Sequence, residues 1–251
     1  MINFYIITLF PDMVRGVLSE SIIGRGEKRG CISINYYQLR EYSQDKHKNV
    51  DDTLYGGGKG MLLTAAPIYN CWSKIKENIT SGNIKTVYMS PKGALLTQDK
   101  AEQLAENKNI IIMCGHYEGV DERVLEEIDA EEISIGDFIL TGGELPCAIL
   151  VDCVARLAEG VLSDPECHEK ESISSGLLEY PQYTKPFNFM GREVPEILIS
   201  GHHANVDKWR REQSLKITAE RRPDLLEKNI DKLDEKDLKY LRENNLFGVT
   251  E

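Results

Sequence analysis

Short apolar runs alternate with segments of helical periodicity through the first ~160 residues, which is the pattern of an α/β domain. Thr97 can cap a helix that continues to Asn107, and another helix is expected from about Asp121. We therefore expect helices to alternate with the strands of one sheet. The apolar runs predict these strands over Asn3–Leu9, Cys31–Leu39, Ile84–Met89 and Asn109–Cys114, and a further apolar segment, Ile133–Leu140, leads into Thr141-Gly142-Gly143.

The segment Glu144–Leu157 is apolar on most of its circumference, which predicts a helix that is buried on several sides. Residues 163–172 are polar, charged and aperiodic, as in a linker. About 80 residues then have a mainly helical pattern, in which Leu226, Ile230 and Leu233 predict a terminal amphipathic helix. The sequence thus predicts an α/β domain over 1–162, a linker over 163–172 and a small helical domain over 173–251.

Composition narrows the class of protein. No apolar stretch approaches the ~20 residues that a membrane span needs, and the apolar N-terminus lacks the features of a signal peptide. The six cysteines contain no CxxC pair and the five histidines have no metal-ligand spacing, so we expect reduced thiols, a cytoplasmic location and no metal site.

The net charge of −11 argues against a nucleic-acid partner, because phosphate binding needs positive charge. The charges are unevenly distributed, however: Lys208–Arg222 holds six basic residues against two acidic ones. An acidic protein can bind RNA through such a segment. The same segment can equally be an ordinary solvated face, and charge alone does not decide between the two.

Three glycine-bounded loops follow three of the predicted strands: Ser90–Gly93, Cys114–Gly119 and Ile135–Glu144. Ligands of α/β sheets bind beyond the carboxyl ends of the strands, and glycines let the backbone approach them closely. Any one of these loops by itself is best interpreted as a tight turn. The absence of GxGxxG and GxxxxGK[ST] motifs disfavours Rossmann-type dehydrogenases, Rossmann-type methyltransferases and P-loop NTPases.

Ordered motifs make the interpretation specific. ITLFPDM, DDTLYGGGKGML, SPKG, CGHYEGVDERV, SIGDFILTGGELP, GLLEYPQYTKP and SGHHANVDKWRREQSL follow one another over almost the whole chain. In this order they resemble the tRNA (guanine-N1)-methyltransferase family. The resemblance implies a SPOUT-type α/β domain with a C-terminal trefoil knot made by the three loops, and a small, mainly helical C-terminal domain. It also implies a homodimer that methylates the guanine 3′ of the anticodon, position 37 of tRNA, with S-adenosylmethionine as cofactor.

The resemblance also implies two sets of binding residues. The family often has Tyr where this chain has Phe138 and Arg where it has His116. The expected cofactor contacts are Tyr88, Met89, Ser90, Pro91, Gly115, Tyr117, Glu118, Gly119, Ile135, Gly136, Phe138, Leu140, Gly142 and Gly143. The expected tRNA contacts are Gly57, Gly58, Gly60, Met61, Glu179, His202, Arg210 and Arg221.

The reaction itself requires a base and a cation. The N1 nitrogen of neutral guanine carries a proton, and its removal places negative charge on the neighbouring carbonyl oxygen. By family matching Arg156 is the cation, although an i, i+4 ion pair with Asp152 is an alternative role. The base position, an Asp before a Ser in the family, corresponds here to Glu171-Ser172. Alternatives are a shifted register with Glu169 as the base, or a linker carboxylate without a role.

Three other functions remain to be compared with this one. A SPOUT methyltransferase for another nucleotide is disfavoured by GLLEYPQYTKP and the basic C-terminal block. A non-catalytic RNA-binding protein is disfavoured by the presence of Arg156, Glu118 and Glu171 together. A nucleotide-metabolising enzyme is disfavoured by the missing phosphate motifs.

Overall fold

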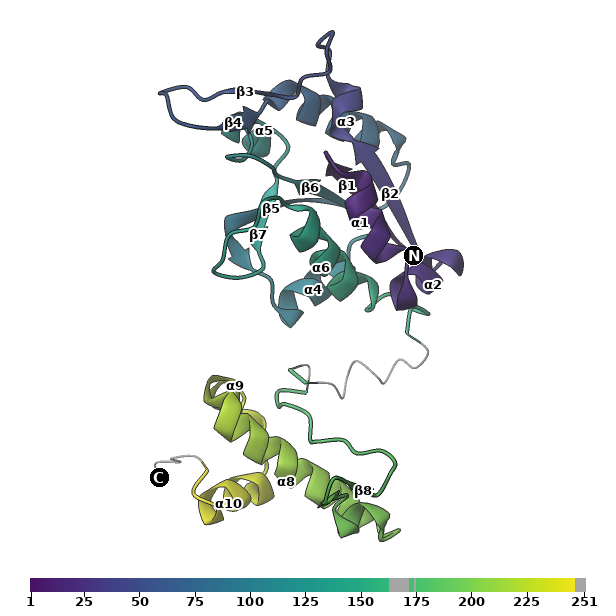
Figure 1. Cartoon of the computed structure of the whole chain (residues 1–251), viewed down its shortest axis with the longest axis vertical. Coiled ribbons are helices and arrows are strands. Elements are labelled where there is room, and N and C mark those ends of the chain that lie inside the picture. Colours follow the sequence, from purple (N-terminus) through teal and green to yellow (C-terminus); the bar gives the residue numbers. More distant parts are fainter. Residues whose placement is uncertain (163–171, 174, 247–251) are drawn as a thin grey trace. The chain divides into compact units, whose positions relative to one another are not determined.

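A computed structural model describes residues 1–162, 172–173 and 175–246 of the chain (Figure 1). The chain divides into two compact units, Met1–Pro165 and Glu166–Glu251, and each unit is described by itself. The proposed linker over 163–172 falls mostly outside the described residues, so its limits stay a prediction. No helix in the described ranges is both long and apolar enough to cross a membrane.

The first unit is built on a five-stranded sheet in the order β2-β1-β6-β5-β7, in which all neighbouring strands are parallel. Parallel strands need crossover connections, and helices supply them here. The predicted α/β class is therefore confirmed. The sheet strands are β1 (Ile2–Thr8), β2 (Ile32–Gln38), β5 (Ile84–Leu95), β6 (Asn109–Cys114) and β7 (Glu131–Ser134), and a separate antiparallel pair is formed by β3 (Asp51–Thr53) and β4 (Met61–Leu63).

Helices cover both faces of this sheet, so its central strands are apolar on both sides. In β6, Ile110 and Ile112 pack into one core cluster, whereas Ile111 and Met113 pack into the other. This alternation follows from the two-residue period of a strand. The helices of the unit are α1 (Pro11–Leu18), α2 (Ser21–Lys28), the short η1 (Leu39–Tyr42), α3 (Ala65–Asn78), α4 (Gln98–Ala105), α5 (Glu122–Glu127) and α6 (Glu144–Ala155).

Strand β5 is longer than predicted. The sequence Ser90-Pro91-Lys92-Gly93 has the composition of a turn, yet the strand continues to Leu95. Its pairing with β7 shifts register between Met89 and Ala94, so the proline lies in an irregular stretch that makes no regular ladder. Ser90, Pro91 and Lys92 of this irregular stretch line the cavity described below.

Helix α6 is less completely buried than its composition predicted. Leu150, Val151 and Val154 are buried, but Leu145 and Ile149 are each 45% exposed. Helix α1, which contacts α6, exposes the large apolar side chains Met13 and Val17, and Phe10 precedes them. We call the exposed side chains of Phe10, Met13, Val17, Leu145 and Ile149 the α1/α6 patch.

The second unit has its own small core, made by Leu177, Leu215, Leu226 and Leu241. Arg211 of α8 and the buried Asp237 of α10 form a two-pronged ion pair, with 2.6 Å between Nη2 and Oδ2. Its elements are β8 (Asn188–Phe189), β9 (Arg192–Glu193), η2 (Glu196–Ile199), α8 (His203–Arg221), α9 (Pro223–Lys228), η3 (Ile230–Lys232) and α10 (Glu235–Glu243).

The predicted amphipathic helix through Leu226, Ile230 and Leu233 is wrong. Helix α9 ends at Lys228, because Asn229 leaves helical geometry and its side-chain amide donates to the Leu225 carbonyl, 2.9 Å away. The last helix starts only after Asp234, whose side chain accepts a hydrogen bond from the Asp237 amide, 2.8 Å away, in a reciprocal capping box. Leu226, Ile230 and Leu233 thus belong to three short segments rather than to one helix.

Candidate active site

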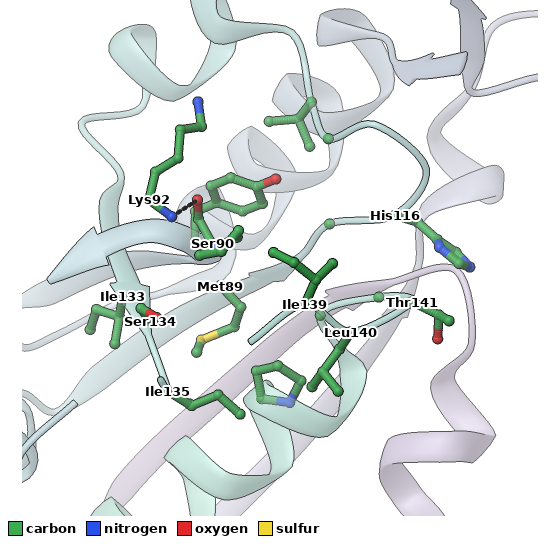
Figure 2. Close-up of a pocket in the computed structure, with 18 of the residues that line it drawn as sticks. Met89, Ser90, Lys92, His116, Ile133, Ser134, Ile135, Ile139, Leu140 and Thr141 are labelled. Carbon is green, nitrogen blue, oxygen red and sulfur yellow. Dashed lines mark hydrogen bonds between the residues drawn. The ribbon is translucent and has the colours of Figure 1, made fainter. Parts of the chain in front are cut away.

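The three glycine-bounded loops surround one cavity of about 290 Å³. They follow Met89 in β5, Cys114 in β6 and Ser134 in β7, so they meet at one end of three adjacent parallel strands. Figure 2 shows the labelled side chains of Met89, Ser90, Ile135, Leu140 and His116 distributed around this space. A cavity at this place is where α/β sheets bind ligands.

The structure brings the whole predicted cofactor set together around this cavity. Residues that the sequence interpretation did not select also line it, among them Lys92, Val120, Glu122, Ile139 and Thr141. Lys92, Ile139 and Thr141 lie inside the same loops, and Val120 and Glu122 closely follow the second loop, so their position along the chain was the signal that could have found them. The cavity-lining members of the predicted set are Tyr88, Met89, Ser90, Pro91, Gly115, Tyr117, Glu118, Gly119, Ile135, Gly136, Phe138, Leu140, Gly142 and Gly143.

Backbone contacts hold the second and third loops against each other. The amide of Gly143 donates to the carbonyl of Gly115 over 2.8 Å, and His116 and Gly142 form an antiparallel bridge. Tyr117 occupies the left-handed region at φ +59°, a conformation that costs energy for a bulky residue and is common at binding sites. Its ring stacks on the His116 ring at 5.0 Å between centroids.

A buried carboxylate explains why glycine is needed at position 142. Glu144 is only 3% exposed, and the hydroxyl of Thr8 donates to its Oε1 over 2.8 Å. A Cβ atom on Gly142 would lie 2.5 Å from Glu144 Oε2, closer than side chains approach in proteins.

Tyr88 forms the floor of the second loop. It is 6% exposed, and its hydroxyl would lie 2.6 Å from a Cβ atom on Gly115. Burial raises the pKa of Tyr88 to about 12, with a further contribution from the carboxylate of Glu132. The phenol is therefore neutral at physiological pH and keeps a proton to donate.

Arg156 lies away from the cavity of its own chain. It caps the carboxyl end of α6, whereas the cavity is lined by Gly143 and Pro146 at the opposite end. Ten residues of α-helix separate Pro146 from Arg156, which is ~15 Å along the helix axis. Leu145, Ile149, Asp152 and Arg156 follow one another at helical spacing along one face of α6.

The predicted catalytic base, Glu171, lies outside the described residues, and so does its alternative, Glu169. In the parts of the chain that are described, no three His, Cys, Asp or Glu side chains lie close enough together to hold a metal ion.

The predicted tRNA contacts fall into two groups, one in each unit. Gly57, Gly58, Gly60 and Met61 lie in and after the β3–β4 loop, where the Glu118 amide donates to the Met61 carbonyl over 3.1 Å. This hydrogen bond attaches the loop to the cavity. In the second unit, Glu179 is exposed, His202 precedes α8, Arg221 ends it, and Arg210 lies over the Tyr180 ring at 5.1 Å.

Comparisons with known proteins agree with the motifs. The family model described as tRNA (Guanine-1)-methyltransferase TrmD matches residues 2–228. A protein of Ruminiclostridium cellulolyticum named tRNA (guanine-N(1)-)-methyltransferase is 51% identical, over 90% of this chain and 97% of that protein. Proteins of the same name from Clostridium acetobutylicum and Clostridioides difficile are 50% and 46% identical, over 96% and 92% of this chain and 97% and 100% of their own lengths. These matches confirm the family resemblance and the enzyme class: the chain belongs to the tRNA (guanine-1)-methyltransferase family.

Proposed function

We propose that the chain transfers the methyl group of S-adenosylmethionine to N1 of guanine in tRNA, at position 37 on the 3′ side of the anticodon. The observation that carries this proposal is that the complete set of expected cofactor residues lines one cavity. We further propose that the three loops form the trefoil knot of the SPOUT fold. The backbone contact between Gly115 and Gly143 agrees with such threading. The reaction would take place in the cytoplasm, in agreement with the free thiols of the described cysteines.

The cavity residues fit this cofactor. Glycines at 115, 142 and 143 let the loops pack closely, because a Cβ atom at each would come within 3 Å of Tyr88, Glu144 or Cys114. All three glycines line the cavity, where their backbone groups can approach a polar ligand. Met89, Ile133, Ile135 and Leu140 supply apolar surface for a nucleoside base (Figure 2). When bound, S-adenosylmethionine would supply an electrophilic methyl group, and the protein has only to orient it and to activate the guanine.

Activation of the guanine would fall to a carboxylate and a guanidinium. Glu171 would accept the N1 proton, and Arg156 would stabilise the negative charge that then develops on the carbonyl oxygen. Removal of the proton makes N1 a nucleophile, and stabilisation of the negative charge on the carbonyl oxygen makes this removal more favourable. This assignment follows the family's motif for Arg156 and, with Glu in place of Asp, for Glu171.

The position of Arg156 supports a homodimer with shared sites. An arginine side chain cannot span the ~15 Å from the carboxyl end of α6 to the cavity at its amino end. If two copies pair through the α1/α6 patch with their α6 helices antiparallel, the carboxyl end of one α6 lies beside the amino end of the other. Arg156 of a second copy would then reach the cavity, and the exposed Leu145 and Ile149 would be covered.

Gly142→Val is expected to prevent cofactor binding, because its Cβ atom would come within 2.5 Å of Glu144 Oε2 and the branched side chain would displace a loop that lines the cavity. Calorimetric titration with S-adenosylmethionine measures this effect. Thr80→Val, which places the same side chain at an exposed position outside the cavity lining, should bind with the parental affinity. If a folded Gly142→Val protein binds S-adenosylmethionine with the parental affinity, the cofactor does not bind in this cavity.

Binding of tRNA is expected to depend on α8 despite the acidic net charge. Several of its basic residues are engaged within the unit, since Arg211 pairs with Asp237 and Lys208 with Glu212. Arg221→Ala and Arg210→Ala should weaken tRNA binding and flatten its salt dependence, because each lost phosphate contact lowers the salt slope by about one. Filter binding at two salt concentrations measures both quantities.

Lys239→Ala is a suitable control for this experiment, because Lys239 is an exposed basic residue of α10, outside the basic segment. If the Arg210 and Arg221 variants bind tRNA like the control at both salt concentrations, the segment is an ordinary solvated face.

The proposed function is tested by methyl transfer from radiolabelled S-adenosylmethionine to an unmodified tRNA transcript. The transcript with guanine at position 37 and a guanine before it should be methylated, and the product nucleoside should be N1-methylguanosine. A transcript with adenine at position 37 should not react. Methylation at another nucleotide would favour a different SPOUT specificity, and binding without any transfer would favour a non-catalytic RNA-binding protein.

A further inference from the structure

Tyr55 is a large aromatic side chain without packing contacts in a loop beside the cavity. It is 99% exposed, whereas the other exposed aromatic side chains of the first unit, such as Tyr69 and Tyr117, keep about half of their surface covered. The following Gly56, Gly57 and Gly58 have φ between +81° and +139°, and a Cβ atom on any of them would meet nothing within 4 Å. These glycines adopt backbone conformations that other residues rarely adopt, in a loop that packs against nothing at these positions. Tyr55 precedes them in the same loop, and its side chain is exposed to solvent.

The base of this loop is fixed to the cavity. Strand β4, which follows the loop, is hydrogen-bonded to the second cavity loop, from Leu63 N to Gly119 O over 3.0 Å and from Glu118 N to Met61 O over 3.1 Å. A Cβ atom on Gly60 would lie 2.6 Å from Glu118 Cγ, so the loop also packs directly on a cavity-lining side chain. Figure 1 shows the loop between β3 and β4 projecting next to α5. The ring of Tyr55 is therefore held near the cavity without lining it.

The groups near Tyr55 suit a nucleic acid. Arg123 of α5 is 77% exposed while it pairs with Asp121, with 2.6 Å between Nη2 and Oδ2. Lys59 belongs to the same loop. A guanidinium and an aromatic ring, both accessible to solvent, can contact a phosphate and the face of a base, respectively.

The reaction exposes a nucleobase on which the ring of Tyr55 can stack. The target guanine beside the anticodon is stacked between its neighbours in a loop, so an enzyme must take it out of that stack to bring N1 into a cavity. Extrusion uncovers the faces of the two neighbouring bases, and an aromatic side chain beside the cavity can cover one of them. We propose that Tyr55 is a positioning residue of the reaction, which stacks on the unpaired base adjacent to the target guanine. This proposal rests on the proposed function and identifies a further contact to the same substrate.

The test uses the full-length protein and a tRNA transcript that carries guanine at the target position. Tyr55→Ala should raise the KM for tRNA about 10-fold or more, since loss of one aromatic stacking contact weakens RNA binding by this order. The kcat at saturating tRNA should change less than KM, and the affinity for S-adenosylmethionine and the Tm should equal those of the parent. Tyr55→Phe should restore the parental KM, because the stacking surface is the ring.

Tyr69→Ala is the matched control, because Tyr69 is a partly exposed tyrosine of α3 whose ring pairs with Trp72. It should leave the KM for tRNA unchanged. A second measurement places 2-aminopurine next to the target guanine in the transcript. Its fluorescence should be quenched by the parent and by Tyr55→Phe, and should remain high with Tyr55→Ala.

Two results would overturn the stacking proposal while the proposed function stands. One is a parental KM for Tyr55→Ala, and the other is an equal loss in Tyr55→Ala and Tyr55→Phe, which would assign the effect to the hydroxyl. If the parent itself transfers no methyl group to any tRNA, the proposed function fails instead, and this outcome is recognised before the variants are compared.

Discussion

Glu171→Gln should lower the single-turnover rate of methyl transfer by about two orders of magnitude or more, which is the usual effect of losing a general base. Glutamine keeps the size and the hydrogen bonding of glutamate but cannot accept the N1 proton. A glutamate with its ordinary pKa of about 4.3 is ionised at neutral pH and can accept that proton while it is hydrogen-bonded to it. Affinity for S-adenosylmethionine should survive, because the expected cofactor contacts lie in other loops.

Two further substitutions separate the possible assignments of the base. Glu171→Asp should retain much of the activity, since aspartate is the residue that the family has at this position. Glu169→Gln should matter little. If Glu169→Gln is inactive while Glu171→Gln methylates at the parental rate, the register of the motif is shifted. If both remain active, another group or solvent takes the proton, and the proposed mechanism is wrong.

Arg156→Ala should lower the rate by a similar factor, about 100-fold or more, because an oxyanion-stabilising cation is lost. The position of Arg156 makes a stronger experiment possible. Gly142→Val and Arg156→Ala subunits can be co-expressed with different tags, and the heterodimer can be isolated through both tags. If the cavity of one copy works with Arg156 of the other, one of the two sites then carries both lesions and the other carries none. The heterodimer should recover about half of the parental activity.

A site contained within one chain gives the opposite result, because both sites of the heterodimer would then carry one lesion and remain inactive. Ile149→Asp supplies the control for the interface. It places a charge in the α1/α6 patch, where Ile149 is 45% exposed in the single chain, so it should not disturb folding of the monomer. It should prevent dimer formation in sedimentation experiments and abolish the recovery. A stable, active monomer would contradict the proposal that the enzyme works as a dimer.

The parts of the fold that follow from local rules were predictable. Strand β6 has the predicted bounds, Asn109–Cys114, because the apolar run that follows Asn109 is what a strand buried on both faces requires. The hydroxyl of Thr97 accepts a hydrogen bond from the Lys100 amide over 3.2 Å, as its place before a helix predicted. In both places the residues of one short segment determine its local structure.

The errors arose where neighbouring segments decide the outcome. Pro91 and Gly93 have turn chemistry, but β7 pairs with the residues on both sides of them and so continues the strand. Leu226, Ile230 and Leu233 have helical spacing, but the side chain of Asn229 ends the helix between them. The spacing of apolar residues in the sequence predicts neither the pairing with β7 nor the hydrogen bond of Asn229.

The candidate site was predictable to a similar degree. Each cavity loop is marked by its glycines, but only the parallel order β6-β5-β7 brings the three loops together. The distance of Arg156 from the cavity was implicit in the predicted elements, because the loop Ile135–Glu144 directly precedes the helix and Arg156 lies at the opposite end. The exposure of the Tyr55 ring could not be predicted, because the motif does not indicate which of its residues are buried.

The pairing of β1 with β6 determines when the growing chain can complete its sheet on the ribosome. Ile6 lies beside Ile112 in this pair, so the first strand must wait for a partner that is synthesised roughly 100 residues later. At ~5–20 residues per second this delay lasts about 5–20 s, during which Phe4, Ile6 and Ile7, all fully buried in the folded unit, lack their central partner. The nascent N-terminus is therefore a long-lived apolar segment that chaperones can bind, and a chain truncated before β6 would expose it permanently.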